Sequence, residues 1–284
     1  MKAIHGIIGS FLLAMLFIGG PVTISSCTKE TVHDTTIIRD TTIIRDTTIV
    51  KDTVCDCVSG LVAYYNFKNG TLADSSGYGN NISFSNATPA ADRNGVANNA
   101  YSFNGTGQYM TVPNSTSLNP GNITLFAIVK MNGFYQGNCR GTVIMQKGSP
   151  DNVLGYYGMR THDQVLDCLA PFDASKQRFQ GAYGNNIPQG IGAGALDTSV
   201  IKLNTTWYKL AYTWDGREAK YYVNGVLTDK RAYSNIVFTA NSQALQIGRT
   251  EHPLFPYWFN GIMDDIRIYN HALSDCAIKE LSKK

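Results

Sequence analysis

Short runs of alternating hydrophobic and polar residues fill the chain from Ser59 to Lys284 and predict an all-β fold. The clearest run spans 122–131, where every second residue is apolar. We expect further strands at 61–67, 100–105, 108–112, 142–147, 156–161, 165–169, 207–214, 218–223, 226–230, 244–248 and 259–270. A short helix should follow, because Ser274 can cap a helix that runs to Leu281. This pattern favours a two-sheet antiparallel jelly-roll sandwich.

Turn signals connect several of these runs. Asp215-Gly216 and Asn224-Gly225 lie between alternating segments, and they predict an antiparallel meander of three strands. Gly105-Thr-Gly107 predicts that 100–105 and 108–112 form a hairpin. Residues 175–196 show no clear alternation and are expected to be looser, with a glycine-rich loop at 190–194.

The strand predicted at 259–270 contains the most specific chemical signal of the chain. With a period of two, one face carries Ile262, Asp264, Ile266 and Ile268, and the other carries Met263, Asp265, Arg267 and Tyr269. The first face has the composition of a core face, yet it includes a carboxylate. A buried carboxylate without a partner costs several kcal/mol. Asp264 is therefore expected to have a metal ion, backbone N–H donors or a cation as its partner.

The residues before the domain predict export and lipid anchoring. Lys2 precedes an apolar run over 6–19 that suits a signal peptide and is short for a membrane span. Ile24-Ser-Ser-Cys27 resembles a bacterial lipobox, which implies a signal peptide over 1–26 and a lipid that attaches Cys27 to the membrane. An ordinary signal peptide or a retained membrane helix are the alternatives. Lys29-Glu30 resembles the charged export signal of surface lipoproteins, which implies the exposed side of a bacterial outer membrane.

A hexapeptide repeat follows the lipobox. Asp34-Thr-Thr-Ile-Ile-Arg39 recurs at 40–45 and, with small changes, at 46–51. Thr and Ile disfavour helix and favour extended chain, so residues 27–58 are predicted to form a stalk that carries the domain at 59–284. The stalk is either a plain spacer or a segment that self-associates through its unpaired strand edges, and a long helix is a third alternative.

Composition and motifs exclude several classes of function. The net charge is +3 and no Lys/Arg cluster occurs in the domain, so binding of nucleic acid by a basic face is not expected. The domain has only three glutamates, Glu218, Glu251 and Glu280, and they are widely spaced. Glycoside hydrolysis usually needs two positioned carboxylates, so we expect a non-enzymatic binding module and regard a glycosidase as the weaker alternative.

Cysteine positions predict disulfides in an exported chain. With Cys27 assigned to lipid, Cys55, Cys57, Cys139, Cys168 and Cys276 remain. We expect Cys139 to pair with Cys168, because they flank adjacent strand signals. Cys276 is expected to pair with Cys57 or with its neighbour Cys55, and the sequence does not decide between them.

Several motifs, taken in order, resemble a known family. Leu61-Val-Ala-Tyr-Tyr-Asn-Phe67, Asp74-Ser-Ser-Gly77, Tyr222-Val-Asn-Gly225 and Phe259-Asn-Gly-Ile-Met-Asp-Asp-Ile-Arg-Ile-Tyr269 are similar to the laminin-G-like, concanavalin A-like jelly roll of bacterial surface proteins. The resemblance runs from Leu61 to about Leu281. It implies a structural Ca²⁺ with Asp74 and Asp264 as ligands, and Asn80 in the same polar loop as Asp74 is a further candidate.

The resemblance also implies a function on the cell surface. It favours an extracellular glycan as the partner, with Tyr257, Trp258, Tyr156 and His162 as candidate ligand-binding residues. Packing in the core is the alternative role for these aromatic residues. A protein-binding adhesion or structural module is the alternative function, because this fold serves that role as well.

Overall fold

The computed structural model describes residues 55–284 except 138–140, 149–154, 164–170, 185–196 and 237. The predicted signal peptide, Cys27, most of the stalk, Cys139 and Cys168 lie outside these residues. In the described part of the chain, no helix is both long and apolar enough to cross a membrane.

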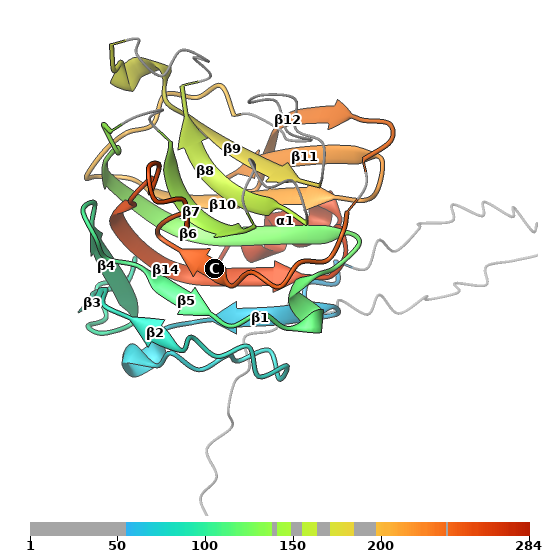
Figure 1. Ribbon diagram of the computed structural model, residues 1–284, viewed down its shortest axis with the longest axis horizontal. Helices are drawn as coiled ribbons and strands as arrows, with labels where there is room; N and C mark the ends of the chain where they lie inside the picture. The colour runs from blue at the N-terminus through green and yellow to red at the C-terminus, as the bar shows by residue number, and fades with distance from the viewer. Residues whose placement is uncertain (1–54, 138–140, 149–154, 164–170, 185–196, 237) are drawn as a thin grey trace, which may run out of the picture.

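Two antiparallel sheets pack face to face (Figure 1), which confirms the predicted sandwich. The larger sheet has the order β12 (Val226–Ala232), β11 (Glu218–Val223), β10 (Trp207–Trp214), β6 (Ile123–Gly133), β14 (Asn260–Tyr269), β4 (Ala100–Asn104) and β3 (Thr88–Ala90), and β1 (Leu61–Tyr65) also pairs with β14. The smaller sheet has the order β2 (Phe84–Ser85), β5 (Met110–Val112), β13 (Leu245–Ile247), β7 (Thr142–Lys147), β8 (Tyr157–His162) and β9 (Arg178–Tyr183). Short 3₁₀ turns lie at Lys68–Gly70, Thr116–Leu118 and Ala174–Lys176, and the helix α1 spans Asp275–Leu281.

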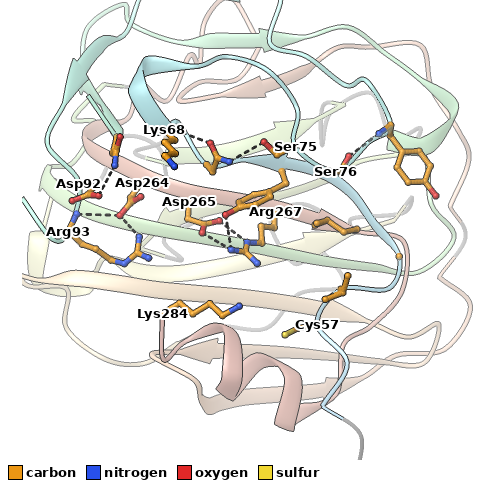
Figure 2. A pocket seen from close by; sticks show the side chains of 17 residues that line it. Cys57, Lys68, Ser75, Ser76, Asp92, Arg93, Asp264, Asp265, Arg267 and Lys284 are labelled. Atoms are coloured by element: carbon orange, nitrogen blue, oxygen red, sulfur yellow. Dashed lines mark hydrogen bonds and ion pairs between the residues drawn. The ribbon is translucent and has the colours of Figure 1, made fainter. Parts of the chain in front are cut away.

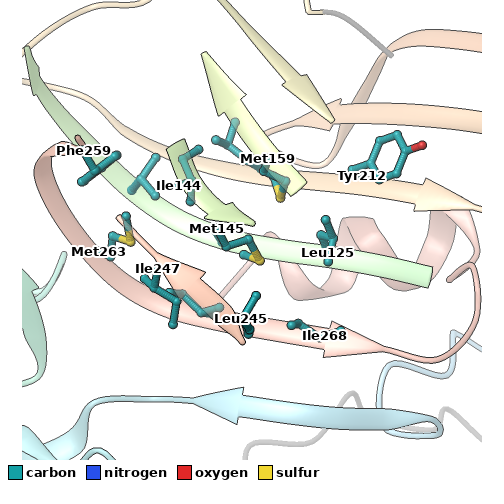
Figure 3. Close-up of a cluster of buried hydrophobic side chains, with 14 of the residues drawn as sticks. Leu125, Ile144, Met145, Met159, Tyr212, Leu245, Ile247, Phe259, Met263 and Ile268 are labelled. Atoms are coloured by element: carbon teal, nitrogen blue, oxygen red, sulfur yellow. The ribbon is translucent and has the colours of Figure 1, made fainter. Parts of the chain in front are cut away.

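The core lies between the two sheets, and its composition follows from the alternation along each strand. On β6, Leu125 and its alternate neighbours point inward, where they meet side chains such as Ile144 and Met145 of β7 (Figure 3). Tyr212 of β10 joins the same cluster and is fully buried. Burial of such side chains stabilises a fold by roughly 1.5–3 kcal/mol each.

A second, smaller cluster covers part of the outer face of the larger sheet. Ile278 and Leu281 of α1 pack there against Phe126 and Ile128 of β6. The helix begins as predicted, because the Ser274 hydroxyl accepts a hydrogen bond from the N–H of Ala277 at 3.2 Å.

The predicted meander is confirmed, since β10 pairs with β11 and β11 pairs with β12. The predicted hairpin over 100–112 is wrong, because its two strands belong to different sheets. β4 pairs with β14 in the larger sheet, whereas β5 pairs with β13 in the smaller one. Phe103 and Met110 therefore enter the core from opposite sides. β9 lies in the region that was expected to be looser.

A disulfide joins the start of the domain to its C-terminal helix. Cys276 of α1 bonds to Cys55, with 5.3 Å between their Cα atoms. Of the two candidates that the sequence left open, Cys55 is therefore a partner of Cys276. Cys57 lies two residues further along the chain, buried in the cluster beneath α1.

Lys147, a buried lysine at the end of β7, forms hydrogen bonds with two loops. The ammonium group of Lys147 donates to the side-chain oxygen of Asn119 at 3.0 Å, and to the side-chain and backbone oxygens of Asn241 at 2.7 and 3.0 Å. Its side chain is fully buried, and this burial lowers the pKa of Lys147 from 10.5 to about 8.

The lowered pKa of Lys147 predicts a pH-dependent stability. Between pH 8 and 10.5 the unfolded chain binds more protons at this residue than the folded chain does, so the free energy of unfolding rises with pH. We expect the wild type to gain about 1 kcal/mol relative to Lys147→Met between pH 8 and pH 9. Urea unfolding of both proteins at both pH values measures this gain. Identical pH dependence of the two proteins would show that the folded state does not shift the pKa of Lys147.

Candidate functional site

A β-bulge in β14 sets the direction of the adjacent carboxylates Asp264-Asp265. Met263 pairs with Val129 of β6, but the next paired residue of β14, Ile266, stands opposite Ala127. Two residues of β14 therefore face a single residue of β6, and the alternation of side chains restarts after them.

Because of the bulge, the core face of β14 differs from the face predicted for this strand. Met263, Ile266 and Ile268 lie in the core, whereas Ile262 is half-buried and outside that cluster. Asp264 does not share a face with Ile266 and Ile268, so that prediction is wrong. Asp264 and Asp265 both line a hollow on the outer face of the larger sheet, together with Arg267.

Arg267 neutralises Asp265 within the same strand. Its Nε and one terminal nitrogen donate to the two carboxylate oxygens at 2.8 and 2.9 Å. The same terminal nitrogen donates to the Tyr64 hydroxyl at 3.1 Å, and the guanidinium lies 4.2 Å from the centre of the Tyr64 ring. Burial and then the charge of Asp265 raise the pKa of Tyr64 to about 12. These contacts therefore fix the relative positions of the Asp265 carboxylate, the Arg267 guanidinium and the Tyr64 hydroxyl.

Arg93 is the partner of Asp264. Its guanidinium and its backbone N–H both donate to the same carboxylate oxygen, the latter at 3.3 Å. Burial raises the pKa of Asp264, while the charge and the hydrogen bonds of Arg93 act in the opposite direction. Of the partners expected for Asp264, the structure shows a cation and a backbone donor.

The hollow around these pairs has a volume of ≈ 750 Å³ (Figure 2). The floor includes residues of β1 and β14, and the surrounding loops add polar side chains. Four basic side chains line it, namely Lys68, Arg93, Arg267 and Lys284. Its three carboxylates are those of Asp92, Asp264 and Asp265. This volume lies within the range of roughly 300–1,000 Å³ that is common for small-molecule sites.

The residues predicted to bind Ca²⁺ do not fit a shared metal site. The Asp74 carboxylate accepts hydrogen bonds from the backbone N–H groups of Tyr64, Ser76 and Asn80 at 2.9 Å each, and from the Ser76 hydroxyl at 2.7 Å. These donors make Asp74 the centre of a turn, and Asp264 is bound to Arg93 instead.

Asn80 is likewise fully engaged within the protein. Its amide nitrogen donates to the Val62 carbonyl and the Ser117 hydroxyl, and its oxygen accepts from Ser115. Among the residues that the structure describes, no three His, Cys, Asp or Glu side chains form a metal-binding group. A structural Ca²⁺ stays a prediction, and Asp74, Asn80 and Asp264 as arranged do not supply its ligands.

A second candidate site, the aromatic–arginine corner, consists of Tyr109, Gln246, Arg249, Glu251 and Trp258. The Arg249 guanidinium lies 3.5 Å from the centre of the Tyr109 ring and 5.9 Å from that of Trp258. Gln246 accepts from Arg249 Nε at 3.1 Å and donates to Glu251 at 2.6 Å. Because Leu245 and Ile247 point into the core, Gln246 lies on the outer face of the smaller sheet.

The other predicted ligand residues have different surroundings. Tyr257 adjoins Trp258, and its ring packs edge-on against Tyr135 at 5.9 Å. Tyr156 is only 1% exposed, so its predicted role as a surface platform is wrong and its ring belongs to the interior. His162 lies at the end of β8 beside Asp163, with 3.8 Å between Nδ1 and Oδ1.

Of the residues predicted from the sequence, Asp264 lies in the hollow and Trp258 in the corner, whereas their partners Arg93 and Arg249, and also Arg267 and Gln246, were not predicted. The position of Arg267 two residues after Asp265 was a usable signal, because both lie on one face of a strand. Arg93 gave no such signal, since it is 171 residues from Asp264 in the chain.

The Asp265–Arg267 pair predicts a strong effect of removing one partner. Arg267→Met leaves a buried carboxylate without its cation, and we expect the free energy of unfolding to fall by about 3–5 kcal/mol. The double variant Asp265→Leu/Arg267→Met should recover most of this loss, because both charges are then absent. Urea unfolding measures both, with Lys283→Met as the control at an exposed ion pair with Glu280. Equal losses of unfolding free energy in the single and double variants would contradict the assignment of Arg267 as the partner of Asp265.

Comparison with solved structures supports the fold. Domain 4 of AbnA, a GH43 extracellular arabinanase from Geobacillus stearothermophilus solved in complex with arabinotriose, is 21% identical, with a TM-score of 0.52 over 78% of this chain and 98% of that one. The binding domain of Paraclostridial Mosquitocidal Protein 1 is 13% identical, with a TM-score of 0.59 over 79% of this chain and 52% of that one. The binding domain of Botulinum Neurotoxin DC in complex with SialylT is 13% identical, with a TM-score of 0.54 over 80% and 52%. This chain thus spans about half the length of those two binding domains.

Sequence comparison identifies the family. No curated protein sequence matches the chain. A family model described as the Concanavalin A-like lectin/glucanases superfamily matches residues 104–279, which cover most of the sandwich. The chain therefore belongs to the concanavalin A-like lectin/glucanases superfamily.

Proposed function

We infer that the domain is a non-catalytic glycan-binding module and that the aromatic–arginine corner is its binding surface. The observation that carries this proposal is the stack of Arg249 with the rings of Tyr109 and Trp258, joined to Gln246 and Glu251 by hydrogen bonds.

The corner combines two kinds of contact that saccharides need. An aromatic ring packs against the C–H groups on one side of a sugar, and planar polar side chains exchange hydrogen bonds with its hydroxyl groups. Trp258, Tyr109 and Arg249 are each partly exposed, and Glu251 is exposed. Their mutual contacts fix the positions of these groups before a ligand arrives, which reduces the entropy lost on binding.

The placement of carboxylates supports binding over hydrolysis. The corner contains one carboxylate, that of Glu251, whereas most glycosidases use two. In the hollow on the other sheet, Asp264 and Asp265 each contact an arginine. Each of these carboxylates would have to leave its ion pair with arginine before it could act on a saccharide.

The similar structures agree with this proposal. One was solved with arabinotriose and another with SialylT. We propose that the ligand of this chain is an extracellular glycan. A lipid on Cys27 and the stalk at 27–58 would hold the module at a bacterial outer membrane, with its binding surface facing outward.

A protein partner is the alternative, and one substitution separates the two. Trp258→Ala should weaken binding to a glycan-array hit at least tenfold, because the ring that stacks on the sugar is gone. Trp207→Ala is the matched control, since Trp207 is a half-buried tryptophan of the larger sheet whose ring contacts Lys130. Isothermal titration measures both affinities.

Equal losses in the two tryptophan variants would rule out the corner as the binding surface. No glycan hit, together with saturable binding of a purified surface protein that Trp258→Ala weakens, would favour the protein-binding alternative.

A further inference from the structure

Arg249 of the aromatic–arginine corner has an unused pair of hydrogen-bond donors. Its Nε donates to Gln246, but within the described part of the chain its two terminal nitrogens donate to no acceptor and form no ion pair. Neither nitrogen is among the buried polar atoms that lack a partner, so both can be reached from solvent. Arg93, Arg231 and Arg267, by contrast, each form an ion pair with an aspartate.

Gln246 fixes the orientation of this guanidinium. Its side chain is only 2% exposed, and its oxygen accepts from Nε of Arg249 and from the Thr111 hydroxyl, both at 3.1 Å. Its amide nitrogen donates to Glu251 at 2.6 Å, so turning the amide over would break all three hydrogen bonds. Because one face of the guanidinium lies on the Tyr109 ring and its Nε points at Gln246, the direction of the terminal nitrogens is set by the protein.

Two terminal nitrogens in one plane match a ligand group that has two acceptor oxygens in one plane. A carboxylate is such a group, and it forms two parallel, charge-assisted hydrogen bonds with a guanidinium. A sugar hydroxyl carries no charge and offers a single oxygen, so its bonds to the same nitrogens are weaker. The geometry of Arg249 therefore favours a carboxylate over a hydroxyl group.

Glu251 is the carboxylate of the corner, and it opposes an anionic ligand only in part. It is exposed, it accepts a hydrogen bond from Gln246, and no ion pair joins it to Arg249 within the described residues. Water and salt screen the charge of an exposed carboxylate. Since Arg249 and Glu251 together carry no net charge, selection of a ligand depends on the direction of the hydrogen bonds and not on an excess of positive charge.

Trp258 places a bound sugar beside these donors. The centre of its ring lies 5.9 Å from the Arg249 guanidinium. The preceding residue, Tyr257, has a φ of 48°, in the left-handed region that residues with a side chain seldom adopt, and its carbonyl accepts from the N–H of Val143 at 2.9 Å. This anchored turn fixes Trp258 relative to Arg249, so a sugar that stacks on the indole has its ring substituents next to the guanidinium.

We propose that the ligand of the corner is an acidic saccharide, and that Arg249 binds its carboxylate through both terminal nitrogens while the sugar ring stacks on Trp258. This inference rests on the proposed function of the corner and specifies the class of glycan that it takes. The ligand carries its carboxylate directly on the sugar ring, as a uronic acid does.

Isothermal titration of the full chain with matched saccharides tests this proposal. The pairs are tetragalacturonate against its fully methyl-esterified form, and 3′-sialyllactose against lactose. We expect at least one acidic member to bind about tenfold more tightly than its neutral partner, because the bidentate pair of a guanidinium with a carboxylate is stronger than its hydrogen bonds to uncharged oxygens.

Two substitutions assign the preference to Arg249. Arg249→Gln should abolish it, whereas Arg217→Gln, at an exposed arginine before β11, should keep it. Glu251→Gln should increase the preference several-fold, since an amide oxygen can still accept from Gln246 but no longer repels the ligand. Unchanged melting temperatures confirm that the variants are folded, and the Glu251 variant tests the proposal even where Arg249→Gln is unstable.

The possible failures are distinguishable. Equal affinities for acidic and neutral members, with binding that Trp258→Ala weakens, would overturn this inference and leave the glycan-binding role intact, whereas no binding of any saccharide would overturn both. A preference that persists in Arg249→Gln would place the carboxylate elsewhere on the protein. Full competition by sodium acetate, at the concentration of the saccharide, would assign Arg249 to a free anion and overturn the saccharide assignment.

Discussion

The structure of the outer face of the larger sheet depends on two adjacent carboxylates of β14, Asp264 and Asp265. β14 pairs with three other strands, β1, β4 and β6. In a regular strand one of these carboxylates would enter the core, where an ionised carboxylate costs several kcal/mol. The bulge at Asp264-Asp265 turns both outward, and each then meets an arginine. The contact of Arg93 with Asp264 holds the 92–99 loop against the outer face of the larger sheet. The guanidinium of Arg267 lies over the ring of Tyr64 of β1. The polar hollow is the result.

The two outer faces of the sandwich consequently differ in chemistry. On the larger sheet, ion pairs and lysines surround a hollow beside the apolar patch that α1 covers. On the smaller sheet, aromatic rings, one arginine and hydrogen-bonded amide and carboxylate groups form the corner. The proposed role in recognition rests on this chemistry, since donors hold the carboxylates of the hollow and the corner as defined contains one carboxylate. The disulfide from Cys55 to α1 fixes the point where the chain enters the domain, beside the hollow.

Local signals in the sequence predicted much of this fold. Period-two alternation located most strands, Asp-Gly and Asn-Gly located the meander, and Ser274 located the start of α1. The bulge could not be predicted, because Ile262 and Met263 are both apolar and hide the shift of one residue that it introduces into the alternation. Trp258 was found through its aromatic loop, but its contact with Arg249 depends on tertiary packing. Arg93 contacts Asp264 only in the folded chain. The sequence therefore predicted a metal ion, a backbone donor or a cation as the partner of Asp264, but it could not decide among them.

The most direct test of the account is the coupling free energy between Arg93 and Asp264. It is obtained from urea unfolding of the wild type, Arg93→Met, Asp264→Asn and the double variant, in excess Ca²⁺ and in chelator. The account predicts a coupling of about 1–3 kcal/mol that is the same in both conditions, because the cation that holds Asp264 is Arg93. Zero coupling, together with a stabilisation by Ca²⁺ that Asp264→Asn removes, would contradict it and would make Asp264 a metal ligand.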